Sequence, residues 1–165
     1  MTNVRAIQLL DDCKLDLDRI DLIIMALGST NSAVPFLTKY AIIKVCGTLE
    51  QCFKTIISDF ATHMQGIPAR NFIDITFRES SMNPNIDNIY KSLSKFNDVW
   101  KNSFKGLING NPLSDRDRIL ASIKSLNNAR NQFAHGGNPT TSFTDVQNYF
   151  TDVTLIIQYL DSSVV

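Results

Sequence analysis

Apolar side chains recur at spacings of three and four residues along almost the whole chain, and this period limits the fold more than any other feature. Such spacing places side chains on one face of an α-helix, whereas a half-buried strand would alternate with a period of two. The first long stripe consists of Val4, Ile7, Leu10, Cys13, Leu17, Ile20, Ile23, Ile24 and Leu27. Because no convincing alternation of period two occurs, we expect an all-α fold.

Turn-forming segments cut this pattern into separate helices. Segments rich in residues typical of loops lie at 28–35 (GSTNSAVP), 65–68 (QGIP), 80–85 (SSMNPN) and 108–112 (INGNP). Between them, apolar stripes predict helices over residues 4–27, 36–64, 68–80 and 86–107. Two further helices are predicted to begin at Ser114 and Ser142, because serine is a favoured N-cap residue. The sequence therefore predicts an all-α bundle of about five to six helices, in a single domain over residues 1–165.

Composition argues against several classes of protein. The chain has 16 basic and 16 acidic side chains, so a nucleic acid would have to be held by a local patch. Three cysteines lie within apolar stripes and only two histidines are present, which makes a zinc site improbable. We expect no cofactor and no metal. Because neither a signal peptide nor a run of about 18 apolar residues occurs, we expect a cytoplasmic protein that does not span a membrane.

The strongest candidate for a functional site is the segment ARNQFAHGG, residues 129–137, at the end of a predicted helix. Arg130 falls within the apolar stripe of that helix, His135 follows it, and the pair Gly136-Gly137 is a typical helix end. At about 100° per residue, His135 would lie about 140° around the helix from Arg130. A site that uses both side chains would then need its second half from a partner chain.

The segment also has an ordinary structural interpretation. In that interpretation Arg130 pairs with an acid of the first helix, and His135 only caps the last carbonyl groups. The letters ARN occur a second time, at residues 69–71, but position 75 is Ile and no histidine follows. We expect no function for that second ARN segment.

Residues 130–137 (RNQFAHGG), preceded by a capped amphipathic helix and followed by a turn and a final long helix, resemble the signature of HEPN domains. The form RNxxAHG with a Ser/Thr-rich turn after it resembles, more narrowly, the bacterial branch that includes the RiboL-PSP-HEPN domains. The motif-bearing resemblance covers roughly residues 114–163. It implies a HEPN-like helical bundle. In catalytic members it implies a metal-independent endoribonuclease that acts as a homodimer, with the motif helices of two protomers facing each other.

The resemblance assigns catalytic roles to Arg130, Asn131 and His135. His135 would act as general acid and base on the ribose 2′-hydroxyl or the leaving 5′-oxygen, because an ordinary histidine exchanges protons near neutral pH. Arg130 would bind the scissile phosphate through its planar, permanently charged guanidinium group. Asn131 would orient His135 or the RNA. The nucleophile comes from the RNA itself, so the expected product carries a 2′,3′-cyclic phosphate.

Three functions remain open from the sequence. The first is this endoribonuclease, in the role of a toxin or anti-phage effector, with an antitoxin or regulatory protein as a further partner. The second is a non-catalytic HEPN-like module for dimerisation, nucleotide binding or protein interaction, which the zero net charge favours. The third is a structural helical-bundle component of a larger complex, which would show large exposed apolar stripes and no cleft at His135.

Overall fold

A computed structural model describes residues 1–63, 65–138 and 140–165 of the chain. Within these residues it contains seven α-helices, one π-helical turn and no strand, so the all-α prediction is confirmed, with slightly more helices than expected. Met64, the expected end of the second apolar stripe, and Pro139, within the turn after the motif, lie outside the described residues.

The helices are, in chain order, α1 (Val4–Leu27), α2 (Val34–Thr62), α3 (Ile67–Ile73), the π-helical turn η1 (Asp74–Arg78), α4 (Ile86–Phe96), α5 (Asp98–Asn109), α6 (Leu113–Ala134) and α7 (Phe143–Ser163). Gly28, with φ of 84°, ends α1 in a backbone conformation that suits glycine. Ser142 begins α7 with a capping box, since its hydroxyl accepts from the Asp145 N–H while the Asp145 carboxylate accepts from the Ser142 N–H. The predicted N-cap at Ser142 is therefore confirmed.

Two predicted boundaries are wrong. The stripe over residues 86–107 is two helices rather than one, because Asn97 is extended at φ −162° and its side chain accepts from the Val99 N–H to begin α5. The helix expected to begin at Ser114 instead begins at Leu113, after Pro112, with no side-chain cap. The ring of Pro112 fixes its φ and carries no hydrogen-bond acceptor, so no side chain caps the first turn of α6.

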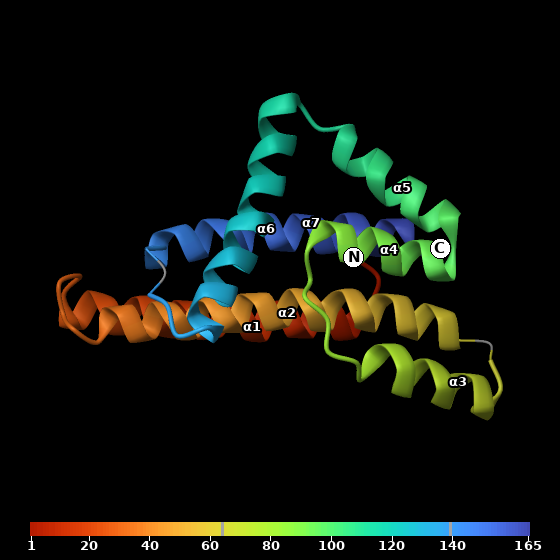
Figure 1. Cartoon of the computed structure of the whole chain (residues 1–165), viewed down its shortest axis with the longest axis horizontal. Coiled ribbons are helices and arrows are strands. Elements are labelled where there is room, and N and C mark those ends of the chain that lie inside the picture. Colours follow the sequence, from red (N-terminus) through yellow and green to blue (C-terminus); the bar gives the residue numbers. More distant parts are fainter. Residues whose placement is uncertain (64, 139) are drawn as a thin grey trace.

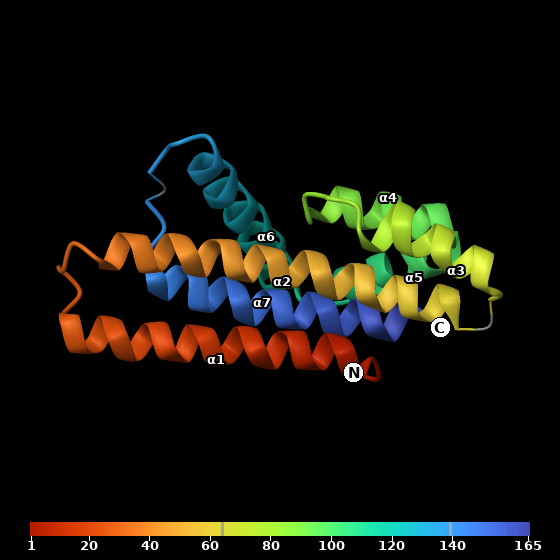
Figure 2. The same ribbon diagram turned by 90° about the horizontal axis from the view of Figure 1, so that it is seen from below.

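The long helix α2 lies at the centre of the molecule. It contacts α1, α7 and α6, and also α3, η1 and α4. Figure 1 shows α1, α2 and α7 running along the long axis, with α6 crossing α2 and α7. In Figure 2, α1 lies on one side of α2, while α6 and α4 lie on the other. The final turn of α6, which carries the motif, therefore lies against α2, across from α1.

A buried carboxylate fixes α6 to α7. Asp152 of α7 is 2% exposed and accepts a hydrogen bond from the Ser122 hydroxyl of α6 at 2.6 Å. Its other oxygen forms an ion pair with Arg118, also on α6. A buried carboxylate is costly unless it is paired and hydrogen-bonded, so these contacts define how the two helices can pack.

The single tryptophan connects three segments of the chain that are distant in sequence. Trp100, at the start of α5, is 6% exposed and packs edge-to-face on Phe60 of α2, with ring centroids 5.2 Å apart. Its indole N–H donates to the Val165 carbonyl at 2.9 Å. The start of α5, the end of α2 and the C-terminal residue are thereby joined. Among the described residues, no helix is both long enough and apolar enough to cross a membrane.

Candidate functional site

The end of α6 is shaped by two glycines that follow His135. The Gly136 N–H donates to the Phe133 carbonyl at 3.0 Å, and the Gly137 N–H donates to the Gln132 carbonyl at 2.8 Å. This pair of bonds is a Schellman motif. Gly136 has φ of 79°, and a Cβ at Gly137 would lie 2.9 Å from the Gln132 oxygen, so each glycine meets a local requirement. The predicted helix end at Gly136-Gly137 is therefore confirmed.

Arg130 lies in the packed stripe of α6, as its sequence position predicts. Ile119, Ile123 and Leu126 of this stripe are buried, and Arg130 itself is partly buried. The side chain lies near α2: the Cys46 thiol donates to the Leu126 carbonyl at 3.7 Å, and the Arg130 charge acts on that thiol. The Arg130 guanidinium donates from Nη1 to the Asn131 side-chain oxygen at 3.1 Å. Asn131 therefore contacts Arg130. The sequence-based prediction is that Asn131 orients His135 or the RNA.

The three cysteines of the chain are buried and are not placed to act as nucleophiles. Burial raises the pKa of the Cys46 thiol to about 12, even though the Arg130 charge acts to lower it. Burial likewise raises the pKa of Cys52 to about 12 and raises the pKa of Cys13 above its usual value. A nucleophilic cysteine must be a thiolate, and these thiols stay protonated at neutral pH. They are core residues, as their positions in apolar stripes predict.

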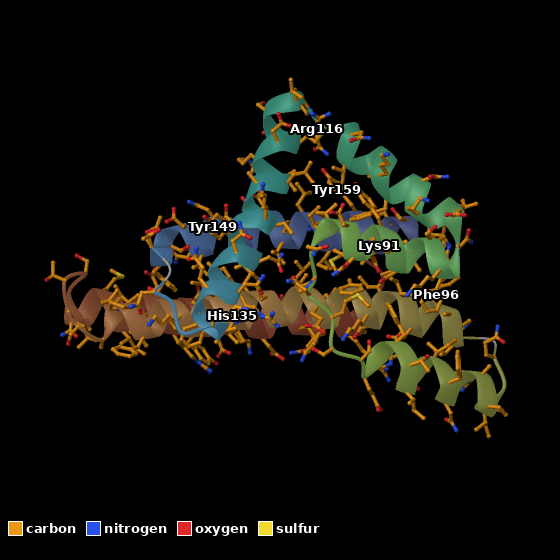
Figure 3. All side chains as sticks on the ribbon, in the orientation of Figure 1. Lys91, Phe96, Arg116, His135, Tyr149 and Tyr159 are labelled. Carbon is orange, nitrogen blue, oxygen red and sulfur yellow. The ribbon has the colours of Figure 1, made fainter. Side chains whose placement is uncertain are left out.

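His135 is exposed at the end of α6 (Figure 3). With φ of −95° and ψ of 18° it lies just beyond the last helical residue, so the angle of about 140° from Arg130, which assumes a continuing helix, does not strictly apply. The backbone N–H of His135 donates to the Asn131 carbonyl at 3.1 Å. Among the described residues, no hydrogen bond engages the His135 imidazole, and none joins it to Arg130.

Lys39 of α2 is a second cation at the motif. Its ammonium group donates to the Asn138 side-chain oxygen at 2.7 Å, in the turn that follows the motif. The same group lies 5.4 Å from the ring centroid of Phe133 and 5.6 Å from that of Phe36, both within the range of a cation–π contact. Sequence reasoning missed Lys39 because 99 residues separate it from Asn138 and no pattern connects the two.

Two acids of α1, Asp16 and Asp18, pair with basic residues other than Arg130. Asp16 pairs with Lys44 at 2.7 Å and with Arg19, and Asp18 pairs with Lys14. In the part of the chain that the structure describes, no ion pair joins Arg130 to any acid, and no group of histidine, cysteine and acidic residues is arranged to hold a metal ion. The interpretation in which Arg130 pairs with a first-helix acid therefore has no supporting contact.

Comparison with known families agrees with this geometry. The family described as RiboL-PSP-HEPN matches residues 3–165, which is nearly the whole chain and includes the motif. Comparisons with curated proteins and with solved structures gave no significant match. The all-α architecture, the helix that ends in RNQFAHGG and the family match lead to one conclusion: the chain belongs to the RiboL-PSP-HEPN family of HEPN domains.

Proposed function

We propose that this protein is a metal-independent endoribonuclease of the HEPN type, with residues 1–165 forming a single domain, and that it acts as a toxin or anti-phage effector. The observation that carries the proposal is the state of His135 at the end of α6. Backbone amides already satisfy the carbonyls of Asn131, Gln132 and Phe133. The imidazole is therefore not needed as a helix cap and is exposed for proton transfer.

The proposed reaction uses three residues of the motif. His135 removes the proton from a ribose 2′-hydroxyl, whose oxygen attacks the adjacent phosphorus. The bond from phosphorus to the 5′-oxygen breaks, and a protonated imidazole returns a proton to that oxygen, leaving a 2′,3′-cyclic phosphate. Arg130 stabilises the charge on the phosphate oxygens. We assign Asn131 a positioning role, because its side-chain oxygen accepts from Arg130 Nη1.

We further propose that the protein acts as a homodimer through the motif helix. Arg130 packs toward α2 while His135 is exposed beyond the helix end, and no contact joins them in the described residues. At the start of α2, where Lys39 lies over the rings of Phe36 and Phe133, Phe36, Tyr40 and Ile43 share one face and remain 71%, 52% and 46% exposed. An apolar face next to an incomplete site suits a second copy of this chain, since apolar contact area is what stabilises most homodimers.

Cleavage of RNA in EDTA tests the catalytic proposal. We expect wild-type protein to cut a mixed RNA in EDTA, to leave 2′,3′-cyclic phosphate ends detectable by mass spectrometry, and to spare DNA of the same sequence. His135→Ala should lower the rate by about 10²–10⁴-fold, the usual contribution of a general acid or base. If wild type fails to cut RNA at every concentration, or His135→Ala retains full activity, the catalytic proposal is wrong.

Mixing two inactive variants tests whether the site is shared. Arg130→Ala protein keeps His135, and His135→Ala protein keeps Arg130. If each site takes Arg130 from one protomer and His135 from the other, mixed dimers contain one intact site, and activity should return to about a quarter of wild type. If both residues come from the same protomer, mixing restores nothing, and the shared-site proposal fails while the catalytic one stands.

A non-catalytic HEPN-like module is the second candidate, because equal numbers of acidic and basic side chains give the chain no general attraction for RNA. This candidate requires wild type to be inactive while still forming a dimer in sedimentation or light scattering. The cleavage assay and the oligomeric state together distinguish it from the endoribonuclease.

A further inference from the structure

A large hollow lies near the motif. Its volume is about 740 Å³, and its walls come from the end of α1, residues 29–32, the start of α2, Asn138, residues 140–142 and the start of α7. Lys39 and Asn138, which bond to each other, both line it. Asn138 is three residues past His135 and Lys39 lies over the Phe133 ring, so these two residues connect the hollow to the motif.

We propose that this hollow, which we call the hydroxyl-lined hollow, binds one nucleotide of the RNA strand, the neighbour of the scissile phosphate. The proposal rests on the proposed endoribonuclease function and adds a substrate-binding site that lies outside the motif.

The lining has the chemistry of a nucleotide site. Most of its polar side chains are hydroxyls or amides, and Lys39 and Asp21 are its charged members. Within the described residues, no hydrogen bond engages the hydroxyls of Ser29, Thr30, Ser32, Thr140, Thr141 or Thr144. Ribose hydroxyls and base edges both donate and accept hydrogen bonds, and so do these side chains.

Apolar residues complete the hollow. Ile24, Val34 and Pro35 line it together with Phe143, which is 7% exposed and anchors the start of α7. An apolar wall with a few placed polar groups is typical of sites for small organic ligands, and the volume lies in their usual range. Lys39 donates to Asn138 at the edge of the hollow. In this proposal its ammonium group contacts the backbone phosphate next to the bound nucleotide.

RNA binding without cleavage tests the proposal. The assay uses His135→Ala protein and a fluorescein-labelled RNA of about eight nucleotides, followed by fluorescence anisotropy. Thr140→Leu, made in that protein, removes a hydroxyl from the hollow and adds a larger side chain without an aromatic face on which a base could stack, and should weaken RNA binding by about tenfold. The matched control is Thr151→Leu, an exposed threonine of α7 that does not line the hollow, and it should bind RNA as the parent does.

Ser32→Leu enters the hollow from the segment between α1 and α2 and provides a second variant should Thr140→Leu fail to fold by circular dichroism. Equal affinity of the hollow variants and the Thr151→Leu control overturns the proposal. Binding of 5′-AMP as tight as that of the RNA also overturns it, because the site would then take a free nucleotide. If wild type never cleaves RNA, but filling the hollow still weakens RNA binding, the catalytic proposal fails while the hollow remains a binding site for one nucleotide of RNA.

Discussion

The two ARN segments of this chain have the same three residues and very different surroundings. Residues 69–71 lie in α3, a helix of seven residues with no buried side chain, and Arg70 donates from Nε to the Gln65 carbonyl at 2.7 Å. Residues 129–131 lie in the last two turns of α6, a helix of 22 residues, where Ala129 is 4% exposed and Arg130 is partly buried.

The comparison indicates that the packing of the helix, rather than the residue types alone, positions the polar side chains of residues 129–131. A helix held against α2 and α7 keeps the Arg130 guanidinium near Asn131 and Lys39 near the motif turn. A short exposed helix leaves Arg70 bound to its own backbone. An arginine that is already positioned loses less side-chain entropy when it binds a phosphate.

The largest expected difference between the two ARN segments is the effect of replacing their arginines on the rate of RNA cleavage. Arg130→Ala should lower the rate of RNA cleavage by about 10²–10³-fold, the usual loss when one donor to a developing anion is removed. Arg70→Ala should leave the rate unchanged, because its guanidinium contacts only nearby backbone. The measurement is initial rates on one RNA with saturating protein. Equal losses in both variants would mean that the arginines act through general charge rather than through position.

The next largest difference is expected at Ala129 and Ala69, where a larger side chain tests how tightly each segment is packed. Ala129→Leu adds three carbon atoms to a site that is 4% exposed, and should lower the free energy of unfolding by about 1–3 kcal/mol. Ala69→Leu adds the same atoms to an exposed site and should change it little. Urea denaturation followed by circular dichroism measures both. A cost at position 69 equal to that at 129 would contradict the packing argument.

The glycines beside the two segments give a smaller effect. Gly136 has φ of 79°, so Gly136→Ala should cost about 1 kcal/mol of unfolding free energy from the strained backbone. Gly66, before α3, has φ of −68°, and a Cβ there would touch only Pro68 at an ordinary 3.9 Å, so Gly66→Ala should be nearly neutral. Thermal melts of the two variants, run side by side, check the order.

The last substitution is expected to have no effect on RNA cleavage. Ile75→His completes the spacing of arginine and histidine in the first ARN segment, within the π-helical turn η1. Introduced into the His135→Ala protein, it should restore no RNA cleavage, since Arg70 lies in a short exposed helix and its guanidinium donates to the Gln65 carbonyl. Recovery of measurable cleavage would show that the spacing alone is sufficient.

The sequence alone predicts the stripes of the helices, the N-cap at Ser142 and the glycine end of α6, because each depends on residues close in the chain. It also carries the motif that indicates the family. It does not predict the break at Asn97, since α4 and α5 both place apolar residues in the same core and the stripe continues across the break. Nor does it predict Lys39 at the motif, a contact made only by the crossing of α2 and α6.

The position of Trp100 has a practical consequence. As the single indole in the chain, buried against Phe60 and bonded to the Val165 carbonyl, it should emit at the blue end of its range in the folded state and shift to the red on unfolding. In Figure 1 the start of α5, where it lies, and the end of α6 are in different parts of the molecule. Intrinsic fluorescence can thus report folding in every motif variant without any label, and RNA bound at the motif should leave the signal unchanged.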